Sequence, residues 1–178
     1  MSVYTNSSTS SPAEIKQYTS AVLDLLGKSQ PLKVLSATER TLRASVKRLS
    51  KRQLAKREAP GKWSIAHVLQ HLADSEIVFA WRLRMIMAHE QPPIQGYDQD
   101  LWANNLGYDK ADAAHSLDTF GAVRTANLRL LKRATPAQLE RFGIHAERGQ
   151  ESVAHLMRLY AGHDLLHLRQ VARIRKTL

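Results

Sequence analysis

The sequence predicts an all-α protein: a bundle of four long helices preceded by an additional N-terminal helix. Every long apolar pattern in the chain repeats with helical rather than strand spacing, and prolines and glycines fall between these patterns. No segment has a convincing strand pattern. We therefore expect no sheet of three or more strands, and at most a small hairpin within the glycine-punctuated segment 142–150.

The expected helices are bounded by prolines, glycines or capping serines, and they cover residues 12–27, 31–50, 64–90, 112–133 and 152–176. Gly27 ends the first helix and Pro31 opens the second. Ser64 and Ser152 are residues of the type that caps helix N-termini. Between the third and fourth helices, residues 94–109 contain two glycines and two asparagines and are expected to form a long loop.

Length and composition favour one domain. The 178 residues are 43% hydrophobic and 24% charged, which is ordinary globular composition. Residues 1–11 are expected to be a polar, disordered lead-in without the pattern of a secretory signal, and residues 12–178 a single helical domain. The chain has no cysteine, which excludes disulfides, thiolate zinc sites and a thiol nucleophile. No apolar run approaches the roughly 20 residues that span a bilayer, so we expect a cytoplasmic protein without a membrane partner.

The positive charge of the chain is concentrated in one segment. The net charge is +10, and the segment 28–62 holds eleven lysines and arginines against two glutamates. One hypothesis is therefore a non-catalytic protein that binds nucleic acid or an acidic partner through this segment. However, the segment has no interleaved aromatic residues on which bases could stack. A solvated basic helix surface is the favoured interpretation, and a nucleic-acid partner is not expected.

The eight histidines of the chain differ in their position on the predicted helices. In the last helix, an angle of 100° per residue places His167 roughly 10° and His163 about 50° from the centre of the apolar stripe, whereas His155 lies about 130° away and should face solvent. The stripe consists of Val153, Leu156, Met157, Tyr160, Val171, Ile174 and Leu178. Imidazoles four residues apart on a buried face can share one metal ion, or they can simply hydrogen-bond to neighbouring side chains.

A third ligand could come from the helix that follows Ser64. His71 lies about 90° from the centre of its apolar stripe and can turn into the bundle, whereas His67, about 130° away, is more easily placed outside it. His67 remains an alternative as a peripheral ligand, because it also forms an i, i+4 pair with His71. For the other three histidines, solvent exposure or a capping role is expected: His89, His115 and His145.

Two segments resemble signatures of a known family. Residues 61–76, GKWSIAHVLQHLADSE, and residues 160–171, YAGHDLLHLRQV, are similar to the two signatures of the DinB/YfiT-like superfamily of metalloenzymes. Residues 97–102 and 117–131 resemble the middle section of that family, so the resemblance covers roughly 31–176. It implies a four-helix bundle that is often dimeric and that holds a divalent metal through three histidines. At the matching positions of this chain these are His71, His163 and His167.

The resemblance also implies a function. It points to a metal-dependent enzyme acting on a small-molecule substrate, most simply a thiol S-transferase that uses bacillithiol, mycothiol or glutathione, or a related hydrolase. Zinc or nickel is expected first, with iron, manganese or cobalt as alternatives, because imidazoles accept all of these ions. Gln170 matches a trailing glutamine of the family and is implied to act beside the metal. A homodimer is expected by resemblance, and because Val78, Met85 and Met87 lie outside the main stripe of their helix.

Three carboxylates are candidates for roles around the metal. Asp164 follows His163 near the buried stripe, and Glu76 lies about 50° from the centre of its own stripe. Either could act as a catalytic general base, or could instead orient a ligand histidine. Asp74, three residues after His71, is a candidate for orienting a ligand histidine. Surface exposure is the alternative for all three.

Overall fold

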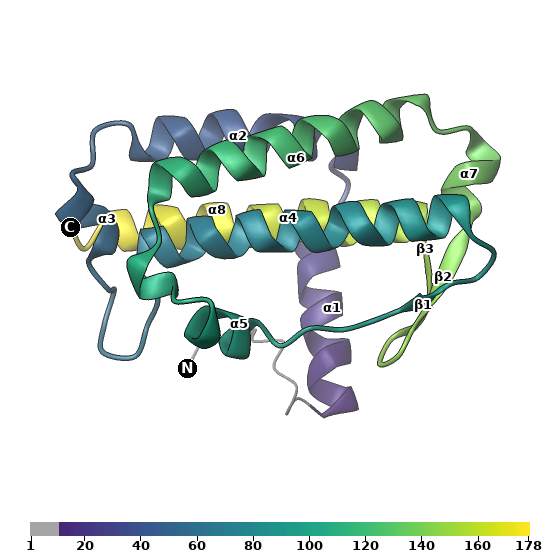
Figure 1. The fold of residues 1–178 in the computed structure, drawn as a ribbon, viewed down its shortest axis with the longest axis horizontal. Coiled ribbons are helices and arrows are strands. Elements are labelled where there is room, and N and C mark those ends of the chain that lie inside the picture. The colour runs from purple at the N-terminus through teal and green to yellow at the C-terminus, as the bar shows by residue number, and fades with distance from the viewer. Residues whose placement is uncertain (1–10) are drawn as a thin grey trace.

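The computed structural model of the chain describes residues 11–178 (Figure 1). Residues 1–10, most of the expected lead-in 1–11, lie outside the described residues. The helices are α1 (Pro12–Leu26), α2 (Pro31–Val46), α3 (Lys51–Ala55), α4 (Ile65–Ala88), α5 (Gln99–Asn105), the 3-10 helix η1 (Tyr108–Lys110), α6 (Ala113–Arg133), α7 (Pro136–Glu140) and α8 (Val153–Arg175). The strands are β1 (Pro93–Ile94), β2 (Phe142–His145) and β3 (Gly149–Ser152).

Helices α2, α4, α6 and α8 lie side by side and form the bundle (Figure 1). Leu35 near the start of α2 and Leu156 near the start of α8 pack with Leu83 near the end of α4. Helices α2 and α8 therefore run in parallel, and α4 runs against them. Helix α6 runs with α4, since Phe120 packs in the cluster around the first half of α4 and Leu131 in the cluster around its second half. The predicted all-α bundle is confirmed.

The parallel direction of α4 and α6 requires the chain to return along the whole bundle between them. This crossover, residues 89–112, was expected to be a loop over 94–109, but it contains β1, α5 and η1. Asp98 caps α5 by accepting hydrogen bonds from the backbone N–H groups of Asp100 and Leu101. Gly107 begins η1 with a φ of 69°, a conformation that glycine adopts without strain. The expectation of a plain loop is wrong.

A small sheet lies at the end of the bundle where α8 begins (Figure 1). The expected hairpin is confirmed as β2 and β3, which pair antiparallel. The expectation that no third strand would be present is wrong, because β1 pairs in parallel with β2 at Pro93 and Ile144. Gly143 permits this approach, since a Cβ there would lie 2.7 Å from the carbonyl oxygen of Pro92. A strand of two residues is too short to show the alternation of apolar and polar residues that identifies strands in a sequence.

The helix boundaries follow local capping. The segment expected as one helix over 31–50 ends at Val46, and Ser50 with Gln53 forms a capping box that starts the separate helix α3. The expected caps are confirmed at α4 and α8, where the Ser64 and Ser152 hydroxyls accept backbone hydrogen bonds from His67 and His155. Within residues 11–178, no helix is long and apolar enough to cross a membrane.

The predicted additional helix α1 crosses the bundle steeply rather than extending it (Figure 1). It buries Ile15, Val22 and Leu26 and packs against α8. The two backbones lie close together at Gly162, where a Cβ would overlap the main-chain carbonyl oxygen of Val22. Because Gly162 directly precedes His163, this contact fixes α1 next to one of the predicted metal ligands.

Candidate metal centre

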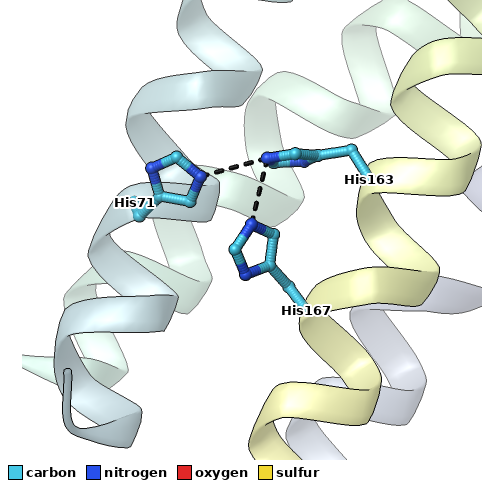
Figure 2. Close-up of side chains that lie close together, drawn as sticks. All are labelled: His71, His163 and His167. Atoms are coloured by element: carbon cyan, nitrogen blue, oxygen red, sulfur yellow. Dashed lines mark hydrogen bonds between the residues drawn. The ribbon is translucent and has the colours of Figure 1, made fainter. Parts of the chain in front are cut away.

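The three histidines predicted as ligands converge in the interior of the bundle. His71 extends from α4, and His163 and His167 extend from adjacent turns of α8, so that all three rings point toward one another (Figure 2). The Nε2 atom of His163 lies 3.0 Å from that of His71 and 3.1 Å from that of His167. All three ligand atoms lie within 4.8 Å of one another.

This spacing fits one shared cation. Neighbouring nitrogen ligands at 2.0–2.1 Å from a metal in tetrahedral or octahedral geometry are separated by about 2.8–3.4 Å. The two shortest Nε2 separations fall in or near this range. Three protein ligands leave at least one coordination position open, as in catalytic rather than structural metal sites.

The environment keeps the three imidazoles neutral, which is the form that binds metals. Burial lowers the pKa of His71 and of His163 well below the usual value, and the neighbouring His167 lowers both further. Burial also lowers the pKa of His167, to about 4, although the hydrogen bond that His167 donates to Gln170 and the charge of Asp164 act in the opposite direction. At neutral pH each ring therefore retains a nitrogen lone pair.

Gln170 and Trp63 contact the rings from outside the cluster. The Oε1 atom of Gln170 lies 2.7 Å from Nδ1 of His167, as expected for a residue that acts beside the metal. The Trp63 ring packs against His71 with the ring centroids 5.1 Å apart. The Nδ1 atom of His71 is buried and has no hydrogen-bond partner in the described part of the chain.

A pocket opens beside two of the histidines. His71 and His163 line it, and its empty volume, including space open to solvent, is ≈ 580 Å³. Helix α1 forms one wall with Tyr18, Thr19 and Val22. The remaining walls hold mostly polar side chains, among them Ser75, Arg82, Tyr97, Gln99, Arg148 and Tyr160.

Comparison with known proteins agrees with this geometry. The family profile described as the DinB superfamily matches residues 35–171. The chain belongs to the DinB superfamily. A relative from Oceanobacillus iheyensis is 31% identical over 137 residues, which cover 77% of this chain and 79% of the relative. A relative from Bacillus mycoides is 28% identical over 137 residues, with the same coverage of both chains. Both carry provisional names as metal-dependent hydrolases.

A solved structure shares the fold. YfiT from Bacillus subtilis superposes with a TM-score of 0.77 at 24% identity, covering 85% of this chain and 89% of its own. That protein is described as having an unusual four-helix bundle topology and, again provisionally, as a metal-dependent hydrolase. The DinB profile begins after α1, so the pocket wall formed by Tyr18, Thr19 and Val22 lies outside the matched segment.

The two predicted general bases of this DinB protein lie together in a buried ion-pair network. Glu76 and Asp164 are each 1% exposed and both bind Arg124 of α6. Asp164 Oδ2 also accepts a hydrogen bond from Thr38, and Glu76 Oε1 accepts one from Asn127. Surface exposure, which was the alternative for these two carboxylates, is therefore wrong for both. Neither residue lines the pocket, and their role as general bases stays a prediction.

Asp74 is buried but does not contact a ligand histidine. Its two carboxylate oxygens accept hydrogen bonds from the Tyr108 hydroxyl, at 2.6 Å, and from the Gln70 amide, at 3.1 Å. Asp74 thus connects α4 to η1 beside the site, and its predicted role in orienting His71 has no contact to support it. Burial raises the pKa of Tyr108, and the hydrogen bond to Asp74 and the charge of Asp74 raise it further.

The other histidines lie outside the cluster. His67 is 6% exposed, and its Nε2 lies 3.1 Å from the Asp109 carboxylate, so it is buried without joining the metal site. His89 and His115 are exposed as expected, and His155 is only partly exposed. The expectation of an exposed His145 is wrong: it is 1% exposed, because β2 turns its side chain inward and its Nδ1 accepts a hydrogen bond from the Glu147 backbone.

Sequence reasoning did not identify the charged residues around the site. Arg124 lies on the same helical face as Leu117, Phe120 and Leu131, and Arg82 lies three residues after Phe79 on the buried face of α4. A charged residue within an apolar stripe indicates a buried ion pair or a ligand site. That signal was present in both helices and would have found both residues.

Proposed function

We propose that this DinB-superfamily protein is a metal-dependent enzyme that acts on a small-molecule substrate in the pocket beside His71 and His163. The observation that carries the proposal is the convergence of three neutral Nε2 atoms at the wall of that pocket. His71, His163 and His167 would hold one divalent metal, for which zinc or nickel is the first choice and iron, manganese or cobalt the alternative. The names of the relatives support metal dependence.

When bound, such a metal would lower the pKa of a coordinated water or thiol and polarise a substrate carbonyl. The residues of the chain prepare the site for this chemistry. Two long packed helices carry the ligands, so the rings are held by rigid elements. Gln170 accepts a hydrogen bond from Nδ1–H of His167 and thereby directs the lone pair of Nε2 toward the cluster. Trp63 limits the movement of the His71 ring.

The reaction that we propose is the transfer of a low-molecular-weight thiol of the bacillithiol, mycothiol or glutathione type to an electrophilic substrate. The thiol would be activated at the metal position held by His71, His163 and His167, and its proton would pass to a general base, for which Asp164 and Glu76 remain the candidates. Its sulfur would form a bond to the electrophilic carbon, and the leaving group of that carbon, such as chloride, would depart with the bonding electron pair. Hydrolysis is the second candidate, favoured by the names of the relatives. It would use water in place of the thiol at the same position. We propose a cytoplasmic location, where such thiols are kept reduced.

Metal content and activity together test the proposal. We expect the purified protein to contain about one divalent metal per chain, and we expect His167→Ala to lose it, whereas His115→Ala and His155→Ala retain it. Elemental analysis by mass spectrometry measures this. The activity screen compares conjugation of each thiol to 1-chloro-2,4-dinitrobenzene with hydrolysis of 4-nitrophenyl acetate. Metal-dependent conjugation supports the transferase, and hydrolysis without a thiol requirement replaces it with the hydrolase. Absence of metal from the wild-type protein overturns both.

The non-catalytic alternative is less well supported by the charges in the segment 28–62. Two of its cations are already paired: Arg43 with Glu39 and Asp118, and Arg57 with Asp109. We therefore do not propose a nucleic-acid partner. DNA binding that falls steeply with salt and does not depend on metal would contradict this choice.

A further inference from the structure

The pocket beside the histidines contains a buried positive charge without a matching acid. Arg82 on α4 lines the pocket and is 6% exposed. Its hydrogen bonds go to neutral oxygens, at 2.6 Å from Nη2 to the carbonyl of Gln95 and at 3.5 Å from Nη1 to the hydroxyl of Tyr160. Within residues 11–178 no carboxylate lies within ion-pair distance of Arg82. Buried cations are normally paired, so this one requires a partner.

A buried acid whose charge acts on Arg82 is already paired with another arginine. Glu151 on β3 is 1% exposed and accepts two hydrogen bonds from Arg148, at 2.6 Å from Nε and 3.0 Å from Nη2. Arg148 also lines the pocket, with its side chain 14% exposed. Glu147 also acts electrostatically on Arg148, but it is exposed, so in the buried part of this wall the charge of Arg82 is in excess. A single negative charge on a ligand would balance it.

Neutral donors surround this excess charge. The hydroxyls of Tyr97 and Tyr160 belong to residues that line the pocket, and that of Tyr97 lies 2.9 Å from the hydroxyl of Ser75. Burial raises the pKa of both tyrosines above the usual value, so their hydroxyls keep their protons at neutral pH. Arginine and protonated tyrosine are hydrogen-bond donors that suit a carboxylate group.

We infer that Arg82, supported by Arg148, forms an anion subsite that binds a carboxylate group of the substrate while the reacting end of the substrate faces His71 and His163. The inference deepens the proposed function and rests on it for the role of the pocket as the substrate site. The substrate class is then a small monocarboxylate, or a thiol that bears a carboxylate. The two walls of the pocket then have different roles: the histidine wall would hold the metal, and the arginine wall would orient the substrate.

Benzoate and benzamide are matched probes for this subsite, because they have nearly the same shape and differ in charge. We expect the wild-type protein to bind benzoate at least tenfold more tightly than benzamide in isothermal titration calorimetry. Arg82→Gln should weaken benzoate binding at least tenfold and leave benzamide binding unchanged. Arg148→Gln should weaken benzoate less. The control is Arg158→Gln, an exposed arginine of α8 outside the pocket, which should bind both probes like the wild type.

The histidine variant separates this inference from the proposed function. Benzoate could also bind a metal directly, so the titration is repeated with His167→Ala, after circular dichroism has shown that it remains helical. Charge-dependent benzoate binding in that variant supports the subsite even if no metal is found in the wild-type protein. Equal affinities for benzoate and benzamide in the wild-type protein overturn the inference, and this comparison holds even if Arg82→Gln does not fold. Tighter binding of inorganic phosphate than of benzoate, lost in Arg82→Gln, overturns the assignment to carboxylates.

Discussion

The Oε1 atom of Gln170 lies 2.7 Å from Nδ1 of His167, three residues earlier on the same helix. An amide oxygen can only accept a hydrogen bond, so Nδ1 of His167 carries the proton and Nε2 carries the lone pair. That lone pair points into the cluster formed with His71 and His163 (Figure 2). The geometry of this side-chain pair therefore fixes which nitrogen of His167 is available to a metal.

Removing the amide oxygen should weaken metal binding without abolishing it. We expect Gln170→Ala to lower the metal affinity by about 10- to 100-fold, the usual effect of losing a residue that orients a ligand histidine. Gln170→Glu keeps an acceptor at this position and should retain most of the affinity. Competition with a chromogenic chelator measures both. Arg169→Ala, an exposed neighbour, is the control. Equal affinities of the wild-type protein and Gln170→Ala would show that the hydrogen bond does not orient the ring.

Two buried helical glycines should respond differently to alanine. At Gly162 the added Cβ meets the backbone of Val22, which cannot move without displacing α1. At Gly121 it meets the flexible carboxylate end of Glu39. We expect Gly162→Ala to lower the free energy of unfolding by about 2–3 kcal/mol, the upper part of the range for overpacking. Gly121→Ala should stay within about 1 kcal/mol, because better helix propensity offsets the side-chain shift.

Urea denaturation followed by circular dichroism measures both variants. Gly162→Ala should also change the pocket, since α1 carries Tyr18, Thr19 and Val22 into its wall. A larger loss of stability in Gly121→Ala than in Gly162→Ala would contradict the close packing of α1 on α8.

Buried His145 should make the stability of the protein depend on pH. Burial, followed by the charge of Arg148, lowers the pKa of His145 to about 4, although Glu151 acts in the opposite direction. The unfolded chain takes up this proton near pH 6.5 and the folded chain only near pH 4, so stability falls as the pH decreases between these values. From pH 7.5 to pH 5 the contribution of His145 is on the order of 2 kcal/mol.

The measurement compares urea denaturation of the metal-free wild-type protein and His145→Gln at the two pH values. The variant should lose less stability on acidification, although the other buried histidines leave some dependence in both proteins. His115→Gln, at an exposed position, should behave like the wild type. An identical pH dependence in His145→Gln and the wild-type protein would be evidence against a neutral, buried His145.

The homodimer stays a prediction, but residues other than Val78, Met85 and Met87 now support it. Met87 packs partly against the core, whereas Ile77 and Trp81, one turn apart on α4, are 46% and 66% exposed. Large exposed apolar side chains, tryptophan above all, are enriched in interfaces. We expect light scattering to give twice the chain mass of 20.1 kDa, and Trp81→Glu to give the monomer mass. A monomeric wild-type protein at micromolar concentration would contradict the prediction.

The sequence by itself determined the elements that have a strong local signal. The apolar stripes and the proline, glycine and serine boundaries located the long helices, and stripe geometry selected His71, His163 and His167 before any contact was known. That arithmetic could not be applied to His145, which was expected in a loop and lies in a four-residue strand where no helical period applies. It also could not detect β1, whose two residues are held only by pairing with β2.

Only the tertiary structure decided which side chains share the pocket and which carboxylates are already paired. Helical position placed Glu76 and Asp164 near the ligands, but their contacts with Arg124 depend on how α6 packs against α4 and α8. Arg82 and Arg148 are 66 residues apart in numbering and line one pocket because the β2–β3 hairpin lies at the end of the bundle where α4 ends. Local periodicity indicates which face of a helix is buried. The residues that this face contacts are determined by the packing of segments distant in sequence.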